Sequence, residues 1–113
     1  MITYNKRDIV LVPFPFSDQT FIKKRPAVVI SSNDYNNYSF DIIIMAVTSN
    51  IEAYSKIGEC LINNYKEAGL LKPSSIKPAI STINKSLILR KLGTLSLKDI
   101  NLMEKILREL LGL

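Results

Sequence analysis

The chain has 113 residues, a formal net charge of +5 and a sequence pI of about 9.4, and 47% of its residues are hydrophobic. This length indicates one domain, residues 1–113, and the composition allows a buried core without disulfides or metal ions. The chain has no histidine, which excludes zinc sites built on Cys and His, Ser-His-Asp triads and Cys-His pairs.

The first half of the chain carries the signals of three short strands. Residues 8–16, "DIVLVPFPF", are apolar on both strand faces, which predicts a strand buried on both sides. "PAVVIS" at 26–31 and "FDIIIMAVT" at 40–48 predict two further strands, and the cluster "NDYNNY" at 33–38 predicts a turn between them.

Two more strands are predicted in the second half. "KIGECLI" at 56–62 alternates weakly, and "SIKPAISTI" at 75–83 reads as a strand that Pro78 interrupts. The polar segment between them, which begins "NNYKEAG", is a connection. Many short strands separated by turn signals favour a small barrel or a sandwich.

The C-terminal segment has the periodicity of a helix. It should begin after Ser96 as N-cap, with Asp99 in capping-box position and a Glu104–Arg108 pair, and end at Gly112. One helix face is apolar: Ile100, Met103, Leu107 and Leu110. Three residues widen that face and indicate deep packing, which is favoured, or a partner: Leu102, Ile106 and Leu111. The fold class is therefore α+β, mainly β, with an all-β core closed by a C-terminal helix.

Cysteine usage and hydropathy indicate a cytoplasmic protein. Cys60 is the single cysteine, so no internal disulfide can form, and we expect it in the core. The start "MITYNKRD" has no signal-peptide segment. The apolar run at 42–47 is far shorter than the roughly 18 residues of a membrane-spanning helix.

A basic cluster precedes the second predicted strand. In "FIKKRPAVVISS", Lys23, Lys24 and Arg25 stand directly before Pro26, which holds the preceding residue extended and is tolerated as the first residue of a strand. A guanidinium held in this way suits bidentate binding of phosphate, with the lysines adding less specific charge. The alternative is a solvated loop with a turn proline. The net charge suits nucleic acid or an acidic protein as a partner.

These residues belong to a longer series of motifs. Residues 7–36, "RDIVLVPFPFSDQTFIKKRPAVVISSNDYN", resemble the N-terminal half of the MazF/PemK family, the toxins of type II toxin–antitoxin systems. "VTSN" at 47–50, "GLLKPSSIKPAISTINKS" at 69–86 and "LRKLGTLS" at 89–96 extend the resemblance over nearly the whole chain. One departure is Arg7, where the family usually has glycine.

The resemblance implies a small SH3-like barrel with C-terminal helices, assembled as a homodimer. It implies a ribonuclease that cuts single-stranded RNA within short sequences, without a metal or another cofactor, and that an antitoxin neutralises with an acidic tail. The family's catalytic arginine and threonine match Arg25 and Thr48.

Further residues are assigned to RNA binding. They are Lys23, Lys24, Ser49, Lys77 and Thr82. Phe16, Tyr35 and Tyr38 are candidate stacking platforms for unpaired bases.

Two rival functions stay open at this stage. The same barrel serves CcdB-type toxins, which poison DNA gyrase by binding it, largely through C-terminal residues. The presence of both Arg25 and Thr48 favours the nuclease. A third hypothesis is a basic RNA-binding module without catalysis.

Overall fold

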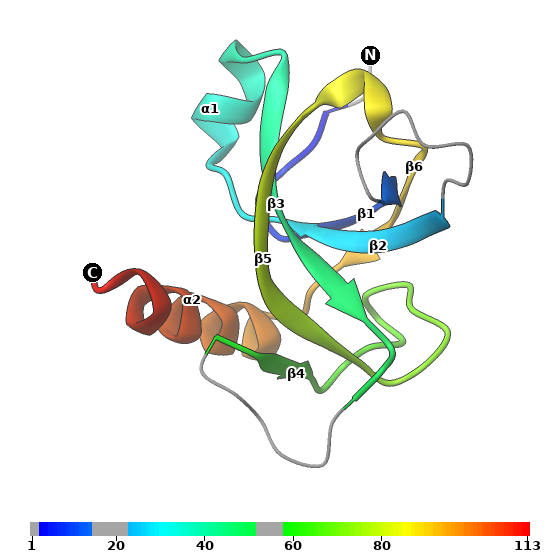
Figure 1. The fold of residues 1–113 in the computed structure, drawn as a ribbon, viewed down its shortest axis with the longest axis vertical. Coiled ribbons are helices and arrows are strands. Elements are labelled where there is room, and N and C mark those ends of the chain that lie inside the picture. Colours follow the sequence, from blue (N-terminus) through cyan, green and yellow to red (C-terminus); the bar gives the residue numbers. More distant parts are fainter. Residues whose placement is uncertain (1–2, 15–22, 52–57) are drawn as a thin grey trace.

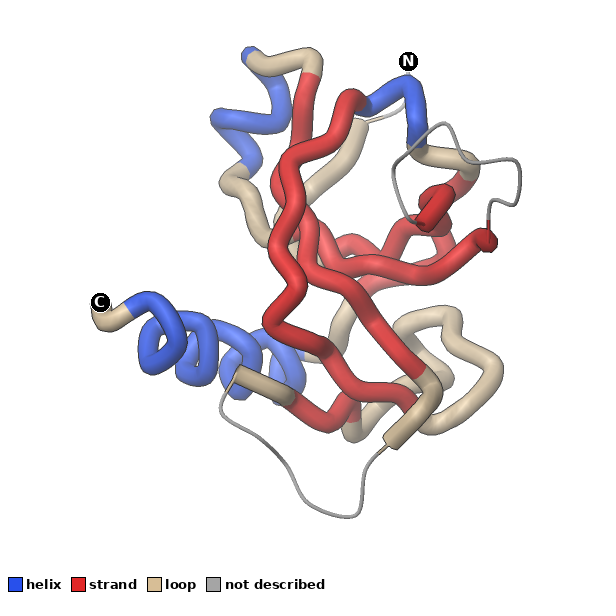
Figure 2. Tube along the Cα trace, viewed as in Figure 1, coloured by secondary structure: helices blue, strands red, loops and turns tan. Residues whose placement is uncertain are grey.

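The protein, described by a computed structural model over residues 3–14, 23–51 and 58–113, is built on one curved antiparallel sheet (Figure 1). The six strands lie in the order β4-β5-β3-β2-β1-β6. In chain order the elements are β1 (Asp8–Phe14), β2 (Lys23–Val29), α1 (Asn33–Tyr38), β3 (Asp41–Thr48), β4 (Cys60–Ile62), β5 (Ser74–Asn84), the 3-10 turn η1 (Lys85–Leu87), β6 (Arg90–Thr94) and α2 (Leu97–Leu111). The sheet curls into a half-barrel beside α2, which confirms the predicted mainly β fold with a C-terminal helix (Figure 2).

Both faces of the central strands are buried, so the sheet separates two apolar clusters. In β1, Ile9 packs in a cluster with Ile100 and Met103 of α2, whereas its neighbour Val10 packs in a second cluster with Ile44 of β3. Successive side chains of a strand point to opposite faces, so a strand covered on both sides must be apolar at every position. This confirms the prediction of a doubly buried strand, within the bounds Asp8–Phe14.

The second strand begins earlier than predicted. β2 starts at Lys23, so Pro26 is its fourth residue rather than its first, and the strand ends at Val29. The cluster of cations therefore belongs to a strand and not to a loop. β2 pairs with β1 from Lys23 onward but with β3 only from Ala27, so β2 has no ladder with β3 at Pro26. The missing N–H of this proline is tolerated at such a position.

Pro78 does not end the fifth strand. β5 runs from Ser74 to Asn84, and its register against β3 shifts between Ile76 and Ile80. The residues between these two positions, 77–79, form a bulge opposite one residue of β3. A bulge leaves strand positions unpaired, which is where a strand accepts proline. The strand is therefore continuous and not interrupted as predicted. Pro78 still disturbs its regular pairing with β3, because proline lacks the N–H that pairing needs.

The predicted turn at 33–38 is a short helix, α1. The hydroxyl of Ser32 accepts a hydrogen bond from the backbone N–H of Tyr35 at 3.1 Å and so caps the first turn. Asn36 is buried and donates to the backbone carbonyls of Tyr4 and Ser31. These contacts with residues outside the segment favour a helix over the turn that the local composition predicts.

Two strands near the sheet edges differ from the prediction. β4 covers only Cys60–Ile62; of the predicted strand 56–62, residues 56 and 57 lie outside the described residues, and 58 and 59 are not in a strand. β6, Arg90–Thr94, was not predicted as a strand, because its sequence "RKLGT" is basic and contains glycine. Backbone pairing with β1 stabilises this strand, although its local sequence has little strand propensity.

The C-terminal helix is confirmed at both ends. Ser96 is the N-cap, and Gly112 ends the helix with a φ of 70°. One predicted ion pair differs: Glu104 pairs with Lys6 at 3.0 Å and not with Arg108. Ile106 packs on the core, whereas two of the residues expected to pack, Leu102 and Leu111, are exposed. Among the described residues, no helix is long and apolar enough to span a membrane.

Candidate active site

A cleft of about 690 Å³ opens along one end of the sheet. Its floor is apolar and includes Leu11 of β1, which pairs with Pro26 of β2 on one side and with Arg90 of β6 on the other. β2 and β6 therefore flank this floor. The described residues that line it are Leu11, Lys23, Lys24, Arg25, Pro26, Val47, Ser49, Gly69, Leu70, Leu71, Lys72, Ser74, Arg90 and Leu92.

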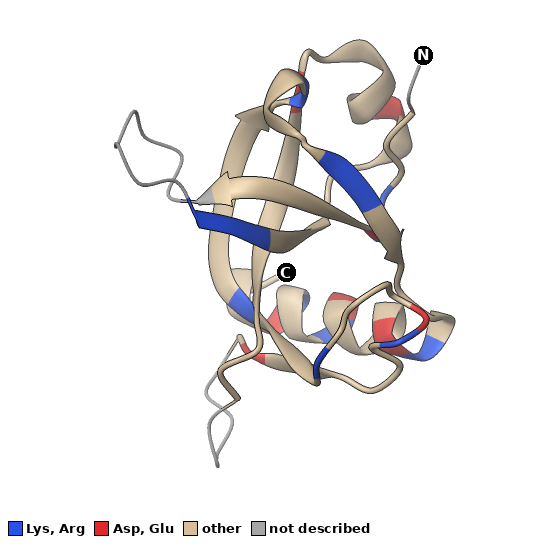
Figure 3. Cartoon of the chain, turned by 90° about the vertical axis from the view of Figure 1, so that its right-hand side faces the viewer, with Lys and Arg blue, Asp and Glu red and all other residues tan. Residues whose placement is uncertain are grey.

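Every charged residue in the described part of this lining is a cation. They are Lys23, Lys24 and Arg25 of β2, Lys72 of the segment before β5, and Arg90 of β6. Figure 3 shows the basic segments of β2 and β6 on the same side of the molecule. Cations gathered over an apolar floor create a positive potential that attracts a polyanion carrying apolar groups, and single-stranded nucleic acid has this chemistry.

Arg25 and Thr48 occupy matching positions on neighbouring strands. The β2–β3 ladder ends with Ala27 opposite Ala46, and the same register continued for two residues places Arg25 opposite Thr48. Alternation along each strand gives both residues the sheet face of those two alanines. Both side chains are half-buried. Arg25 also lines the cleft, whereas Thr48 lies between two lining residues, Val47 and Ser49.

The hydroxyl of Thr48 has a defined local role. Its Oγ1 accepts a hydrogen bond from the backbone N–H of Asn50 at 3.1 Å, which orients the side chain at the end of β3. A threonine hydroxyl that accepts one hydrogen bond still has its own proton to donate. The contact therefore holds the hydroxyl in place and leaves it able to act on a ligand.

The other predicted site residues divide into two groups. Lys23, Lys24 and Ser49 line the cleft together with Arg25. Lys77 and Thr82 are exposed on β5 but do not contribute to this lining, so their roles in RNA binding stay predictions.

Two of the three predicted stacking aromatics lie outside the cleft. Tyr35 and Tyr38 lie on α1, which contributes no residue to the lining. Phe16 lies outside the described residues.

Two cleft residues, Lys72 and Arg90, were missed by the sequence reasoning. Both stand within segments that carry the family resemblance, "GLLKPSS" and "LRKLGTLS", but nothing in the local pattern marks them as functional. They reach the cleft because β6 pairs with β1 and because the segment before β5 packs against β6. Such contacts between distant segments cannot be read from charge alone.

A second hollow, of about 440 Å³, has a different character. It carries three cations, but Lys6 pairs with Glu104 at 3.0 Å and Lys91 pairs with Asp8 at 3.2 Å. Its positive charge is therefore largely neutralised within the protein. The hollow is lined by Asn5, Lys6, Arg7, Asp8, Asn33, Lys91, Thr94, Ile100 and Glu104.

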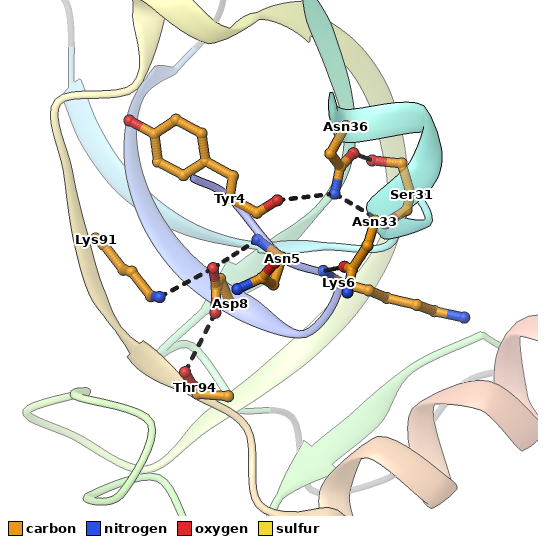
Figure 4. A network of polar contacts seen from close by, with 9 residues as sticks. All are labelled: Tyr4, Asn5, Lys6, Asp8, Ser31, Asn33, Asn36, Lys91 and Thr94. Atoms are coloured by element: carbon orange, nitrogen blue, oxygen red, sulfur yellow. Dashed lines mark hydrogen bonds and ion pairs between the residues drawn. The ribbon is translucent and has the colours of Figure 1, made fainter. Parts of the chain in front are cut away.

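Asp8 has a structural role in this second region (Figure 4). Its buried carboxylate accepts hydrogen bonds from the backbone N–H of Asn5 at 2.8 Å and from the hydroxyl of Thr94 at 3.2 Å, besides the ion pair with Lys91. These contacts tie the start of β1 to β6. Because side chains alternate along a strand, Arg90, the neighbour of Lys91 in β6, lies on the other face of the sheet, where it lines the cleft.

Cys60 is a core residue, as predicted. It is buried, and burial followed by the nearby charge of Asp99 raises the pKa of its thiol to about 11. A thiol with this pKa carries almost no thiolate at neutral pH and is a poor nucleophile. Among the described residues, no group of three or more His, Cys, Asp and Glu side chains is placed to hold a metal ion.

A family model described as PemK-like, MazF-like toxin of type II toxin–antitoxin system matches residues 5–111. The chain belongs to this family. The resemblance found in the sequence motifs is therefore confirmed, and the CcdB-type alternative is not favoured. No curated protein matches the sequence.

Solved structures named MazF or endoribonuclease share the fold of this chain. A chain of the MazE–MazF crystal structure (Form III) from Deinococcus radiodurans is 18% identical, with a TM-score of 0.79 and 99% of each chain covered. An endoribonuclease from a mycobacterial species is 16% identical, with a TM-score of 0.79, 100% of this chain and 95% of that chain covered. The Mycobacterium tuberculosis toxin MazF-mt6 is 16% identical, with a TM-score of 0.77 and 95% and 98% covered.

Proposed function

We propose that this PemK/MazF family member is a toxin endoribonuclease that cuts single-stranded RNA at short sequence motifs. One observation carries the proposal: Arg25 lines a cleft whose charged residues, over the described part of the chain, are all cations, and the register of β2 and β3, continued by two residues, would set Thr48 opposite it. The family match and the likeness to proteins named endoribonucleases support it.

The reaction proposed for these groups is an internal transfer of the phosphoryl group. The 2′-OH of a ribose attacks the adjacent phosphorus, the bond from phosphorus to the 5′-oxygen breaks, and that oxygen takes up a proton. The products are a 2′,3′-cyclic phosphate and a free 5′-OH. Negative charge grows on the non-bridging oxygens during the attack, and preorganised donors lower the barrier by stabilising it.

Arg25 and Thr48 supply these donors. The guanidinium can form two charge-assisted hydrogen bonds with the phosphate, and the hydroxyl of Thr48 can add a third. One such preorganised donor typically contributes about 3–4 kcal/mol to lowering a barrier. A guanidinium is permanently charged in proteins, so Arg25 acts here as a hydrogen-bond donor and not as the base, and another group takes up the 2′-OH proton.

The proposal extends to partners and location. A cognate antitoxin neutralises the toxin, in keeping with a solved mycobacterial endoribonuclease in complex with its cognate antitoxin. The toxin itself works as a homodimer in the cytoplasm. The excess of positive charge suits both RNA and an acidic antitoxin tail.

The test is incubation of the purified protein with a long single-stranded RNA in the presence of EDTA, followed by mapping of the cut ends. We expect cuts at one short motif, each with a cyclic phosphate and a 5′-OH. An RNA with 2′-deoxyribose only at the cut site should bind and stay intact. Loss of activity in EDTA, or cutting of the deoxy-substituted RNA, would contradict the proposed chemistry.

A further inference from the structure

The cleft has a second basic wall, formed by Leu71 and Lys72 before β5 and by Arg90 of β6. Leu11 lies on the floor between Pro26 of β2 and Arg90. Neighbouring strands lie about 4.8 Å apart, so the backbones of β2 and β6 are about 10 Å apart across the floor. Long cationic side chains from both strands can therefore reach one bound strand of nucleic acid.

Close backbone packing builds this wall. A Cβ added at Gly69 would lie 2.0 Å from the backbone oxygen of Leu92, and one added at Gly93 would lie 2.5 Å from the backbone of Ala68. The segment before β5 therefore lies directly against β6, with no side chain between the two backbones. This contact places Lys72 and Arg90 in the same wall.

The segment that carries Lys72 is fixed on both sides. Leu70 is buried in the core, and the hydroxyl of Ser74 donates to the backbone carbonyl of Lys72 at 2.9 Å. Within the described part of the chain, neither Lys72 nor Arg90 forms an ion pair. The wall thus presents two cations on a fixed backbone without an acidic partner.

The residue before Lys72 in the cleft lining, Leu71, is an exposed leucine. Leu71 is 97% exposed, although its neighbour Leu70 is 8% exposed. A leucine beside two cations in a cleft adds an apolar surface at the place where charge would hold a phosphate. This combination matches a nucleotide, which carries an anionic phosphate and an apolar base face.

We propose that Leu71, Lys72 and Arg90 form a second RNA-binding subsite, which holds a nucleotide next to the scissile one. Lys72 and Arg90 each bind one of the two phosphates that flank this nucleotide, and Leu71 packs against the face of its unpaired base. The inference rests on the proposed ribonuclease function. It assigns to this wall the positioning of the RNA, while Arg25 and Thr48 act at the reacting phosphate.

The salt dependence of binding tests the two cations. Each phosphate contact in single-stranded nucleic acid contributes about 0.7 to the slope of log K against log salt concentration. The probe is mixed-sequence 2′-O-methyl RNA, which cannot be cut because its 2′-oxygen is blocked. We expect Lys72→Gln and Arg90→Gln each to lower the slope by about 0.7. Lys105→Gln on α2, an exposed lysine outside the cleft, is the matched control and should keep the wild-type slope.

A second comparison tests the leucine. Leu71→Ala should weaken binding of this RNA severalfold but leave unchanged the binding of an abasic chain of the same length. Because Leu71 is exposed, the variant should fold normally, and circular dichroism checks this. Equal losses on both probes would show that Leu71 contacts no base.

Cleavage kinetics separate this inference from the proposed function. If the wild-type protein does not cut RNA, the proposed function is wrong. If the wild-type protein cuts RNA and the Lys72 and Arg90 variants keep the wild-type slope and KM, the second subsite is wrong. The expected result is a raised KM with a nearly unchanged kcat for both variants, which is the signature of lost uniform binding.

Discussion

At the scale of single residues, the candidate site depends on where two strands stop pairing. Arg25 and Thr48 stand just beyond the last residues that β2 and β3 pair with each other, whereas Arg25 still pairs with Val12 of β1 and Thr48 with Ser75 of β5. A residue that is paired on one side only has a fixed backbone, and its side chain lies where the two strands part. This is the arrangement that a preorganised donor requires.

The first prediction concerns these two donors. Arg25→Ala should lower kcat by about 10²-fold or more, because it removes a charged donor aimed at the transition state. Thr48→Ala should lower kcat in the same direction but by less, since its hydroxyl is neutral. The measurement is single-turnover cleavage of an RNA containing the mapped motif.

Lys24→Ala provides the comparison within the cleft. It should raise KM and flatten the salt dependence while kcat stays close to that of the wild type. Full turnover in the Arg25→Ala variant would place the catalytic site elsewhere on the molecule.

The second prediction concerns Asp99, which holds the segment after β4. Its buried carboxylate accepts hydrogen bonds from the backbone N–H groups of Asn63 and Asn64 at 2.9 and 2.8 Å. Burial acts to raise the pKa of Asp99, but the bonds from Asn64, Asn63 and Ser96 outweigh it and hold the pKa below its usual range. This carboxylate also takes part in the capping of α2, although it bonds the Ser96 hydroxyl rather than the N-cap backbone.

Asp99→Asn should lower the free energy of unfolding at neutral pH by roughly 2–4 kcal/mol, because hydrogen bonds to a charged acceptor contribute about 1.5–3 kcal/mol each. The depressed pKa makes this contribution complete above the ordinary Asp pKa of about 3.9. It is lost as the pH falls through the lower folded value. Urea unfolding of both proteins should therefore show a difference that shrinks below about pH 4. Asp34→Asn, at an exposed position on α1, should show little change, and a pH-independent gap for Asp99→Asn would refute the linkage.

At the scale of elements, the sequence predicted what local chemistry determines. The apolar strands and the capped helix α2 followed from period, composition and the signals of Ser96 and Gly112. β6 and α1 did not, because pairing with β1 and the contacts of Asn36 stabilise them from outside. The same difference applies to the site: the resemblance to the family marked Arg25 and Thr48, whereas the places of Lys72 and Arg90 in the cleft depend on packing between distant segments.

The third prediction concerns the contact between the segment before β5 and β6. Gly69 has a φ of +80°, and a Cβ there would overlap the backbone of Leu92. Gly69→Ala must therefore displace one backbone from the other and should lower the free energy of unfolding by more than about 2 kcal/mol. It should also weaken RNA binding, because the displaced segment carries Lys72.

Gly112→Ala is the matched control for this prediction. Gly112 has a similar φ of +70°, but a Cβ there meets no atom within 4 Å. The control therefore measures the backbone strain alone, about 1–2 kcal/mol for a left-handed residue. Thermal unfolding and RNA affinity of the two variants give the comparison. Equal losses of stability would mean that the close contact with Leu92 adds nothing.

At the scale of the whole molecule, the positive charge is unevenly distributed over the surface. The chain has 15 Lys and Arg residues against 10 Asp and Glu. Two of these cations pair with carboxylates around the second hollow, whereas the described lining of the cleft has five cations and no acid. The electrostatic attraction of the molecule for an anionic partner is therefore concentrated on one surface.

The final prediction is that RNA and antitoxin compete for this surface. A flexible acidic chain can fold over the same cations that bind the RNA backbone, and the apolar floor at Leu11, Pro26 and Leu92 gives it nonpolar area to bury. Since salt does not screen apolar burial, the antitoxin complex should weaken less with salt than RNA binding does. The measurement is binding of labelled 2′-O-methyl RNA to the toxin as its antitoxin is added. We expect the RNA to be displaced in proportion to antitoxin bound. A ternary complex with undiminished RNA affinity would show that neutralisation acts on another surface.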